Sequence, residues 1–313
     1  MLAFTALALA CAPRPAAALG EAIYAAIERS ELVLGDTNSV VPFFPLAFIS
    51  ASYYDNTRVN DLPAGKDPGP YRLNSASQMA ALPVYVAQRD LFLVGDYVSG
   101  AHYDFRYTGE GKDTYSLSIV GGWMHQATPD VQYGAFAAPM LVTGFNSDQP
   151  NRLETYAGFL TRVRESDAFH WWTGIVYDGD NQHHYVFPYL GLEYQCTPEL
   201  AFNFLLPWPG VSYAPTHDWL IGLGAAPAGG SWILDKDGAP AMSLGGINVG
   251  LNIERRLVGQ VWFSVMAGET GLQSFRYSDD QGVDFRTSVD PTFFAQVSLN
   301  FRPETSPAPG AGK

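Results

Sequence analysis

The sequence predicts an all-β protein, an antiparallel up-and-down transmembrane β-barrel of about fourteen strands, on three observations. Apolar and polar residues alternate with a period of two in one segment after another. The longest alternating segments exceed the five or six residues most common in soluble strands and reach the roughly nine to eleven that cross a membrane. Short and long polar connections alternate along the chain, as in outer-membrane barrels, whose two ends differ.

The composition is rich in aromatic residues and poor in charge. Aromatic residues make up 14% and charged residues 16% of the chain, against roughly 25% charged residues in typical soluble domains. After residue 12, no stretch supplies the ~18 consecutive apolar residues of a transmembrane helix, so a membrane crossing has to use strands. The net charge of −13 repels phosphate groups, which argues against a nucleic-acid partner.

The two ends of the chain are expected to lie outside the barrel. Residues 1–20 combine an apolar run with the small residues Ala16, Ala17 and Ala18, as in a secretory signal peptide. Residues 21–41 show helical spacing of apolar residues, and we expect a short periplasmic helix, a plug that enters the lumen or a frayed terminus. The barrel is expected over residues 42–302. Residues 303–313, rich in Pro, Gly and Ala, are expected to be disordered.

The alternation is clearest in residues 291–302, where the odd-numbered positions from Phe293 to Phe301 are apolar and the even-numbered positions from Gln296 to Arg302 are polar. Residues 115–123 and 247–254 repeat this pattern. In residues 91–106 we assign the odd-numbered face, with Leu91 and Tyr103, to lipid and the even-numbered face to the lumen. One face of each strand suits lipid and the other suits water.

The connections set the number of strands. Short links are predicted at 88–90, 127–130, 165–167, 197–199, 216–218 and 255–259, and longer loops at 55–75, 108–113, 144–152, 178–182, 207–210, 234–240 and 278–284. Fourteen strands fit between them, an even number that places both chain ends in the periplasm. Twelve strands stay open as an alternative, because the Pro207-Trp208-Pro209 corner and the Gly/Pro-rich residues 222–230 blur two strands.

Residues 202–213 read Phe-Asn-Phe-Leu-Leu-Pro-Trp-Pro-Gly-Val-Ser-Tyr, and residues 219–223 read Trp-Leu-Ile-Gly-Leu. The Leu-x-Pro-x-Pro-x-x-x-Tyr corner in the first segment resembles an uncharacterised, domain-of-unknown-function family of outer-membrane β-barrels from Gram-negative bacteria, and the resemblance extends over residues 40–302. It implies an outer-membrane barrel without an established activity. The strand ending at Phe301 is similar to the terminal strand recognised by the barrel-assembly machinery, which is therefore an expected partner during biogenesis, beside outer-membrane lipid.

The sequence carries no strong catalytic or metal motif, since it lacks Gly-x-Ser-x-Gly, a Gly-rich phosphate loop, His-Glu-x-x-His and Cys-x-x-Cys. His183 and His184 lie near Asp178 and Asp180, but adjacent strand residues point to opposite faces. We therefore expect no metal, no cofactor and no catalytic residue. A barrel-embedded hydrolase that uses a Ser/His pair stays an alternative.

Polar residues on the inferred inner face form the candidate site. These residues are Asp96, His102, Asp104, Arg106, Gln132, Arg162, Arg164, Asn203, Asn248, Asn252, Glu254, Gln260, Gln296 and Asn300. They either line a hydrated passage or hydrogen-bond to one another in a closed barrel. The expected function is a passive pore or small-solute channel. The alternatives are a structural barrel whose acidic loops meet partners outside the cell, and a soluble secreted β-sandwich or lipid-binding protein.

Overall fold

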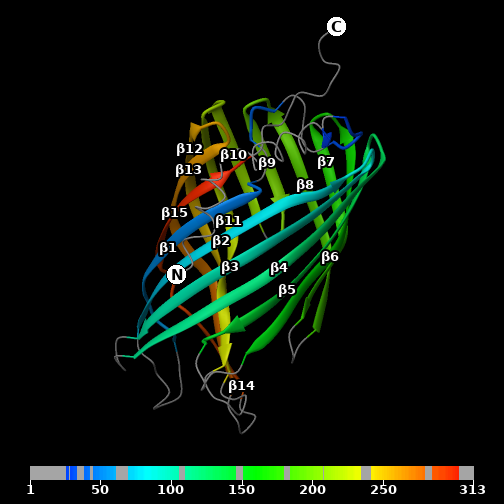
Figure 1. Ribbon diagram of the computed structural model, residues 1–313. Helices are drawn as coiled ribbons and strands as arrows, with labels where there is room; N and C mark the ends of the chain where they lie inside the picture. The colour runs from blue at the N-terminus through cyan, green and yellow to red at the C-terminus, as the bar shows by residue number, and fades with distance from the viewer. Residues whose placement is uncertain are drawn as a thin grey trace.

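The computed structural model describes residues 26–27, 29–33, 39–42, 45–60, 70–105, 110–145, 151–179, 184–206, 208–233, 241–278 and 284–302. These residues form one antiparallel sheet that closes on itself (Figure 1). Strand β1 (Ala47–Thr57) pairs with the last strand, β15 (Phe293–Phe301), and so completes the ring. The predicted antiparallel barrel is confirmed, and the two-sheet sandwich is wrong because a single sheet closes the ring.

The other strands follow in chain order. They are β2 (Tyr71–Val86), β3 (Asp90–Phe105), β4 (Glu110–Thr128), β5 (Val131–Thr143), β6 (Arg152–Ser166), β7 (Phe169–Gly179), β8 (His184–Thr197), β9 (Leu200–Leu205), β10 (Trp208–Thr216), β11 (Trp219–Ile233), β12 (Ala241–Val258), β13 (Val261–Ser278) and β14 (Asp284–Ser288). Both β14 and β15 pair with β13, one after the other. They are two parts of one interrupted strand, so the barrel has the predicted fourteen strands rather than twelve.

Six short turns join the strands at one end of the barrel, the upper end in Figure 1. They occupy residues 87–89, 129–130, 167–168, 198–199, 217–218 and 259–260. The first five lie within about two residues of the predicted links, and the last starts four residues later than the predicted 255–259 because β12 continues to Val258. Gly259 has a φ of 53°, which a residue without Cβ adopts at no steric cost. By the usual rule for such barrels, the short turns mark the periplasmic end.

Large apolar side chains form an exposed band around the outside of the barrel. Ile119 is 69% exposed, whereas its neighbour Ser118 is buried on the inner face. Leaving a Leu or Ile side chain in water costs about 1.5–3 kcal/mol relative to burying it, so a band of this kind needs lipid around it. The fold is therefore that of a transmembrane barrel of the outer-membrane type. Among the described residues, no helix is long and apolar enough to span a membrane.

The barrel is flattened rather than round. Cα atoms of β5 and β11, six strands apart around the ring, lie within 8 Å of each other. Fourteen strands at ~4.8 Å spacing and ~40° tilt would give a round barrel roughly 25 Å or more across. The two walls therefore come close together where β5 faces β11, and the lumen is narrow there.

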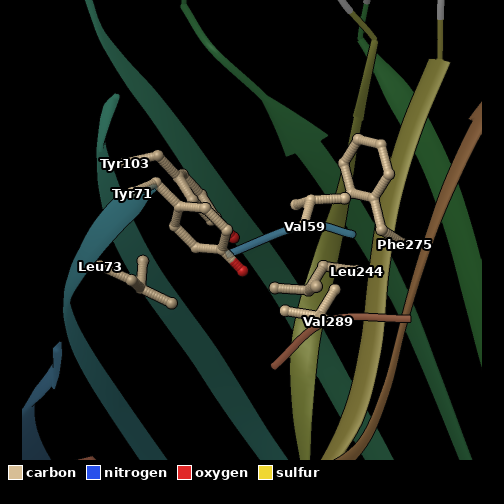
Figure 2. Close-up of a cluster of buried hydrophobic side chains, with 7 residues drawn as sticks. All are labelled: Val59, Tyr71, Leu73, Tyr103, Leu244, Phe275 and Val289. Carbon is tan, nitrogen blue, oxygen red and sulfur yellow. The ribbon is translucent and has the colours of Figure 1, made fainter. Parts of the chain in front are cut away.

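A buried apolar cluster fills part of the interior towards the long-loop end. It is drawn in Figure 2 and consists of Val59, Tyr71, Leu73, Tyr103, Leu244, Phe275 and Val289. These residues come from β2 and β3 on one side, from β12 and β13 on the other, and from the bridge that Val59 forms with Val289. Only β1 and the interrupted β14–β15 strand separate the two sides, so their side chains pack across the fold.

Candidate functional site

Most of the predicted inner-face residues do point into the barrel. In β12, Asn248 and Glu254 are buried, whereas Val249 and Ile253 between them are exposed on the outside. The same alternation and the strand register place the remaining members of the set on the inner face, namely Gln132, Arg162, Arg164, Asn203, Asn252, Gln296 and Asn300. Gln260 lies in the turn between β12 and β13. Arg106 falls outside the described residues.

Three predicted lumen residues, Asp96, His102 and Asp104, lie on the outer face of β3. Asp96 is the register partner of the exposed Ile119 and accepts a 3.0 Å hydrogen bond from Gln78 Nε2. His102 Nδ1 lies 2.7 Å from Asp113 Oδ1 on the same outer surface.

The prediction was wrong for these residues because apolar side chains occupy both faces of β3. Phe92 and Val94 are exposed to the outside, whereas Leu91 and Tyr103 are buried inside. Tyr103 belongs to the apolar cluster, so the inner face of β3 near Tyr103 packs against apolar side chains rather than water. The rule that the apolar face meets lipid fails where the interior is itself apolar.

One polar network closes the seam between β12, β13 and β15 at the short-turn end. Glu254, only 2% exposed, accepts hydrogen bonds from Asn252 Nδ2 at 2.8 Å and Asn300 Nδ2 at 3.1 Å. Arg302 donates to both of its carboxylate oxygens, at 3.0 Å from Nε and 2.8 Å from Nη2. Ser264 Oγ donates to Asn252 Oδ1 at 2.6 Å. Three predicted lumen residues thus bond to one another and to Arg302, and hold the barrel closed.

A second polar cluster lies on the inner face of β4 to β8 at the same end. Arg162 Nε donates to Glu193 Oε2 at 3.2 Å, and Arg164 pairs with Asp167. His170 is the register partner of both Arg164 and Glu193 and is almost completely buried. A small cavity lies among these groups, lined by Val33, Gln126, Pro129, Asp130, Gln132, Arg162, Arg164 and His170.

The sequence prediction missed several interior residues in this cluster, including Gln126, His170 and Glu193. Gln126 could have been found, because it continues the even-numbered polar face of Ser116 and Ser118 along β4. His170 and Glu193 lie in strands whose inner faces mix polar residues with Gly and Trp, so the alternation of polarity is weak there.

The N-terminal segment, residues 29–33 and 39–42, lies against the short-turn end of the barrel. Val33 is held by two interior glutamines: its N–H donates to Gln126 Oε1 at 3.1 Å, and its carbonyl accepts from Gln132 Nε2 at 3.2 Å. Arg89 Nε donates to Glu31 Oε2 at 2.6 Å. This bond lowers the pKa of Glu31 below its ordinary value.

The same segment reaches a different part of the rim a few residues later. Val40 N–H donates to the carbonyl of Pro198 in the β8–β9 turn at 2.7 Å. Val40 and Val41 pack against the inner-face cluster of Ala214, Leu220 and Trp262. Residues 29–33 are therefore anchored at β4 and β5, and residues 39–42 at β8 to β13, at the same end of the barrel.

The part of the chain that the structure describes contains no group of three or more His, Cys, Asp or Glu residues able to hold a metal ion. His184 Nδ1 lies 2.7 Å from Tyr177 Oη on the outer face, whereas Asp178 points inward. These two residues therefore cannot share an ion. His125 Nδ1 lies 2.9 Å from Asp90 Oδ1. His102, His125 and His184 thus contact a carboxylate or a phenol rather than a serine.

No protein-family profile and no curated protein sequence matches the chain. Similar solved structures include a Pseudomonas aeruginosa FadL homologue at 11% identity and a TM-score of 0.45, with 88% of this chain and 97% of that chain covered. The TodX monoaromatic hydrocarbon channel deltaS2 mutant has 9% identity and a TM-score of 0.39, with 82% and 90% covered. The KdgM porin in complex with disordered oligogalacturonate has 7% identity and a TM-score of 0.37, with 81% and 99% covered. At these values the likeness carries no argument about substrate.

Proposed function

We propose that the protein is an outer-membrane channel for small solutes whose periplasmic mouth is covered by residues 29–33 and 39–42. One observation carries the proposal: these two pieces of the N-terminal segment are tied to inner-face groups on two sides of the mouth. A barrel that served only as a surface scaffold would not need a separate segment over its lumen. Gln126, Gln132 and Arg162, which line the small cavity beside Val33, supply polar groups of the kind that line a solute path.

Several further assignments belong to this proposal. The apolar outer band, together with the apparent signal peptide, supports residence in the outer membrane, with lipid as the lasting partner and the barrel-assembly machinery as the transient one. The Leu205-to-Tyr213 corner spans the end of β9 and β10 and supports membership of the uncharacterised barrel family that it resembles. We assign no catalytic activity and no cofactor.

The strength of the closure follows from the contacts of Val33. Two hydrogen bonds of about 0.5–1.5 kcal/mol each hold its backbone. The double variant Gln126→Leu/Gln132→Leu lacks both hydrogen bonds, so the free energy that favours the closed state falls by about 2 kcal/mol. The ratio of closed to open molecules then shifts about thirtyfold towards open. The variant is expected to conduct for a much larger fraction of the time than the natural chain.

Single-channel recording in planar bilayers tests the proposal. The natural chain is expected to stay mostly closed, and the double variant is expected to show frequent conductance steps. Gln78→Leu is the matched control, because it removes a glutamine from the outer face and leaves the mouth untouched. Absence of steps from the natural chain and from the double variant, with folding verified on an unboiled gel, would refute the channel.

A further inference from the structure

The barrel wall has a lateral opening at β9 and β10. These strands have 6 and 9 residues, whereas their neighbours β8 and β11 have 14 and 15. Strand β8 pairs with β9 only from Glu193 to Thr197, and β11 pairs with β10 only from Trp219 to Gly224. On this side, residues 184–192 of β8 and 225–233 of β11 form no backbone ladder with another strand among the described residues, although Gly191 still lies beside Leu205 of β9. Two missing strands leave roughly 14 Å between the backbones of β8 and β11.

The opening lies in the half of the barrel that points to the long loops, within the lipid-facing band. On the outer face beside it, Val186 and Leu190 are each 65% exposed. Tyr185 and Phe187 are on the inner face of β8, yet they are 47% and 48% exposed. Inner-face residues of the closed wall, such as Phe294 on β15, are buried. Tyr185 and Phe187 thus lie uncovered along the stretch of β8 that has no ladder partner on its β9 side.

Prolines mark both edges of the opening. In an antiparallel strand, the backbone groups of successive residues point to opposite neighbours. Gln195 N–H bonds to Ala168 in the β6–β7 turn, so the nitrogen of Pro188, an even-numbered residue, points into the opening. Arg256 N–H of β12 donates to the carbonyl of Asp218, so the backbone groups of Asp218 point to β12. By the same alternation, the nitrogen of the odd-numbered Pro227 in β11 points away from β12 and into the opening.

These prolines decide what can occupy the opening. A proline has no N–H for a ladder and is confined to sheet edges, so an added β-strand from a second protein does not fit either edge. The sequences of both edges, residues 184–192 and 225–233, contain no Asp, Glu, Lys or Arg. Tyr185, Phe187 and, at the tip of the short hairpin, Leu206 and Trp208 supply apolar surface.

Polar groups lie on the inner face one and two strands away, at the level of Tyr185 and nearer the long loops. Asp178 on β7 is the register partner of both Tyr185 and Tyr156. Tyr156 Oη donates to Glu154 Oε2 at 3.4 Å, and Arg152 Nε lies 3.3 Å from Glu154 Oε1. An apolar entrance thus leads to a polar cluster with both signs of charge.

We propose that the opening between β8 and β11 admits the alkyl chain of a single-chain amphiphile from the outer leaflet into the barrel, with its polar head reaching the Arg152 cluster. The proposal rests on the channel function above and names its substrate class. The apolar cluster of Figure 2 packs between β2–β3 and β12–β13, away from this opening.

Fluorescence quenching by lipids with brominated acyl chains tests the opening itself. A bimane label is placed at Phe187→Cys in the Cys11→Ser/Cys196→Ser background, in proteoliposomes. Its emission is expected to fall about as much as that of the lipid-facing control Val186→Cys. The inner-face control Gln296→Cys, on the closed wall, is expected to keep its emission. A label at position 187 that keeps its emission as position 296 does would overturn the proposal.

A transport assay separates this proposal from the channel itself. The probe is a lysophosphatidylcholine with a twelve-carbon chain, added outside liposomes that contain trapped albumin. In the Gln126→Leu/Gln132→Leu background, whose mouth is open, Phe187→Asp puts a charge in the apolar entrance and is expected to slow lysolipid uptake about tenfold or more. Phe187→Leu keeps the entrance apolar and is expected to slow uptake far less. Folding of both variants is checked on unboiled gels.

The outcomes are distinguishable. Equal lysolipid uptake by Phe187→Asp and Phe187→Leu, with normal conductance of the Gln126→Leu/Gln132→Leu variant, overturns the lateral entrance and leaves the channel standing. Quenching at position 187 without transport of lysolipid or ions by any variant overturns the channel and leaves the opening as a binding site for alkyl chains.

Discussion

Replacing Glu254 by alanine tests whether the buried network holds the barrel seam together. The Glu254 carboxylate accepts hydrogen bonds from Asn252 and Asn300 and two from Arg302. The side chain of Arg302 is only 11% exposed, so the guanidinium group would keep a largely buried positive charge after losing this partner. Removing one member of a buried ion pair costs about 3–5 kcal/mol. The unfolding equilibrium should therefore shift by a factor of about one hundred to several thousand.

The assay is equilibrium urea unfolding in phospholipid vesicles, followed by tryptophan fluorescence, with the folded fraction checked on unboiled gels. The Glu254→Leu/Arg302→Met variant is the control, because it removes both charges and replaces them with apolar groups of similar volume. It should recover most of the lost stability, since such replacements are often neutral or stabilising. A loss below about 1 kcal/mol in Glu254→Ala, the size expected for an exposed pair, would refute the reasoning.

Three other predictions concern backbone packing, pH dependence and orientation. Gly268→Ala should destabilise the barrel by a few kcal/mol in the same urea assay, because the added Cβ would lie 2.0 Å from the carbonyl oxygen of Val249. Gly134→Ala, whose nearest contact would be 3.8 Å, should be tolerated. Equal losses of stability in the two variants would contradict this reasoning. The pKa of Glu31 is lowered in the closed state, so the contribution of Glu31 to closure is present above its ordinary pKa and is lost as the pH falls through the lowered value. Bilayer conductance should therefore rise in acid, and Glu31→Gln should remove this pH dependence. An unchanged pH profile in Glu31→Gln would count against the Glu31–Arg89 contact. In the Cys196→Ser background, a membrane-impermeant maleimide should label Phe145→Cys, on the long-loop side, in intact cells, and His217→Cys, in a short turn, only after the outer membrane is opened; the reverse pattern would invert the assigned orientation.

The fold could be predicted from the sequence because most strands face two different environments. In β15 every odd-numbered side chain from Phe293 to Phe301 faces outward and the even-numbered side chains face the interior. The residue types therefore alternate in polarity with a period of two. The short turns are equally readable, because each carries polar residues between two such segments. Strand number and connection order followed from these two features together.

The interior could be predicted only where it is polar. The inner face of β3 packs into a cluster that joins Tyr71 and Tyr103 to Phe275, residues far apart in sequence whose proximity depends on closure of the ring. Nothing in residues 91–106 distinguishes an apolar face that meets lipid from one that meets other side chains. The inverted placement of Asp96 and His102 follows from this ambiguity.

Neither the closure of the mouth nor the lateral opening could be predicted from the sequence. The bonds of Val33 to Gln126 and Gln132 span more than ninety residues, and no local pattern encodes them. The Pro207-Trp208-Pro209 corner made one strand boundary uncertain in the sequence. In the structure, the hairpin around it is the short one that leaves the edges of β8 and β11 unpaired.

The most direct test of the account is heat modifiability of the membrane-extracted protein. A closed transmembrane barrel resists detergent until it is boiled, so unboiled samples from the outer-membrane fraction should run faster on a gel than boiled samples. Identical migration of boiled and unboiled samples, from a protein that stays soluble without detergent, would contradict the barrel and everything built on it.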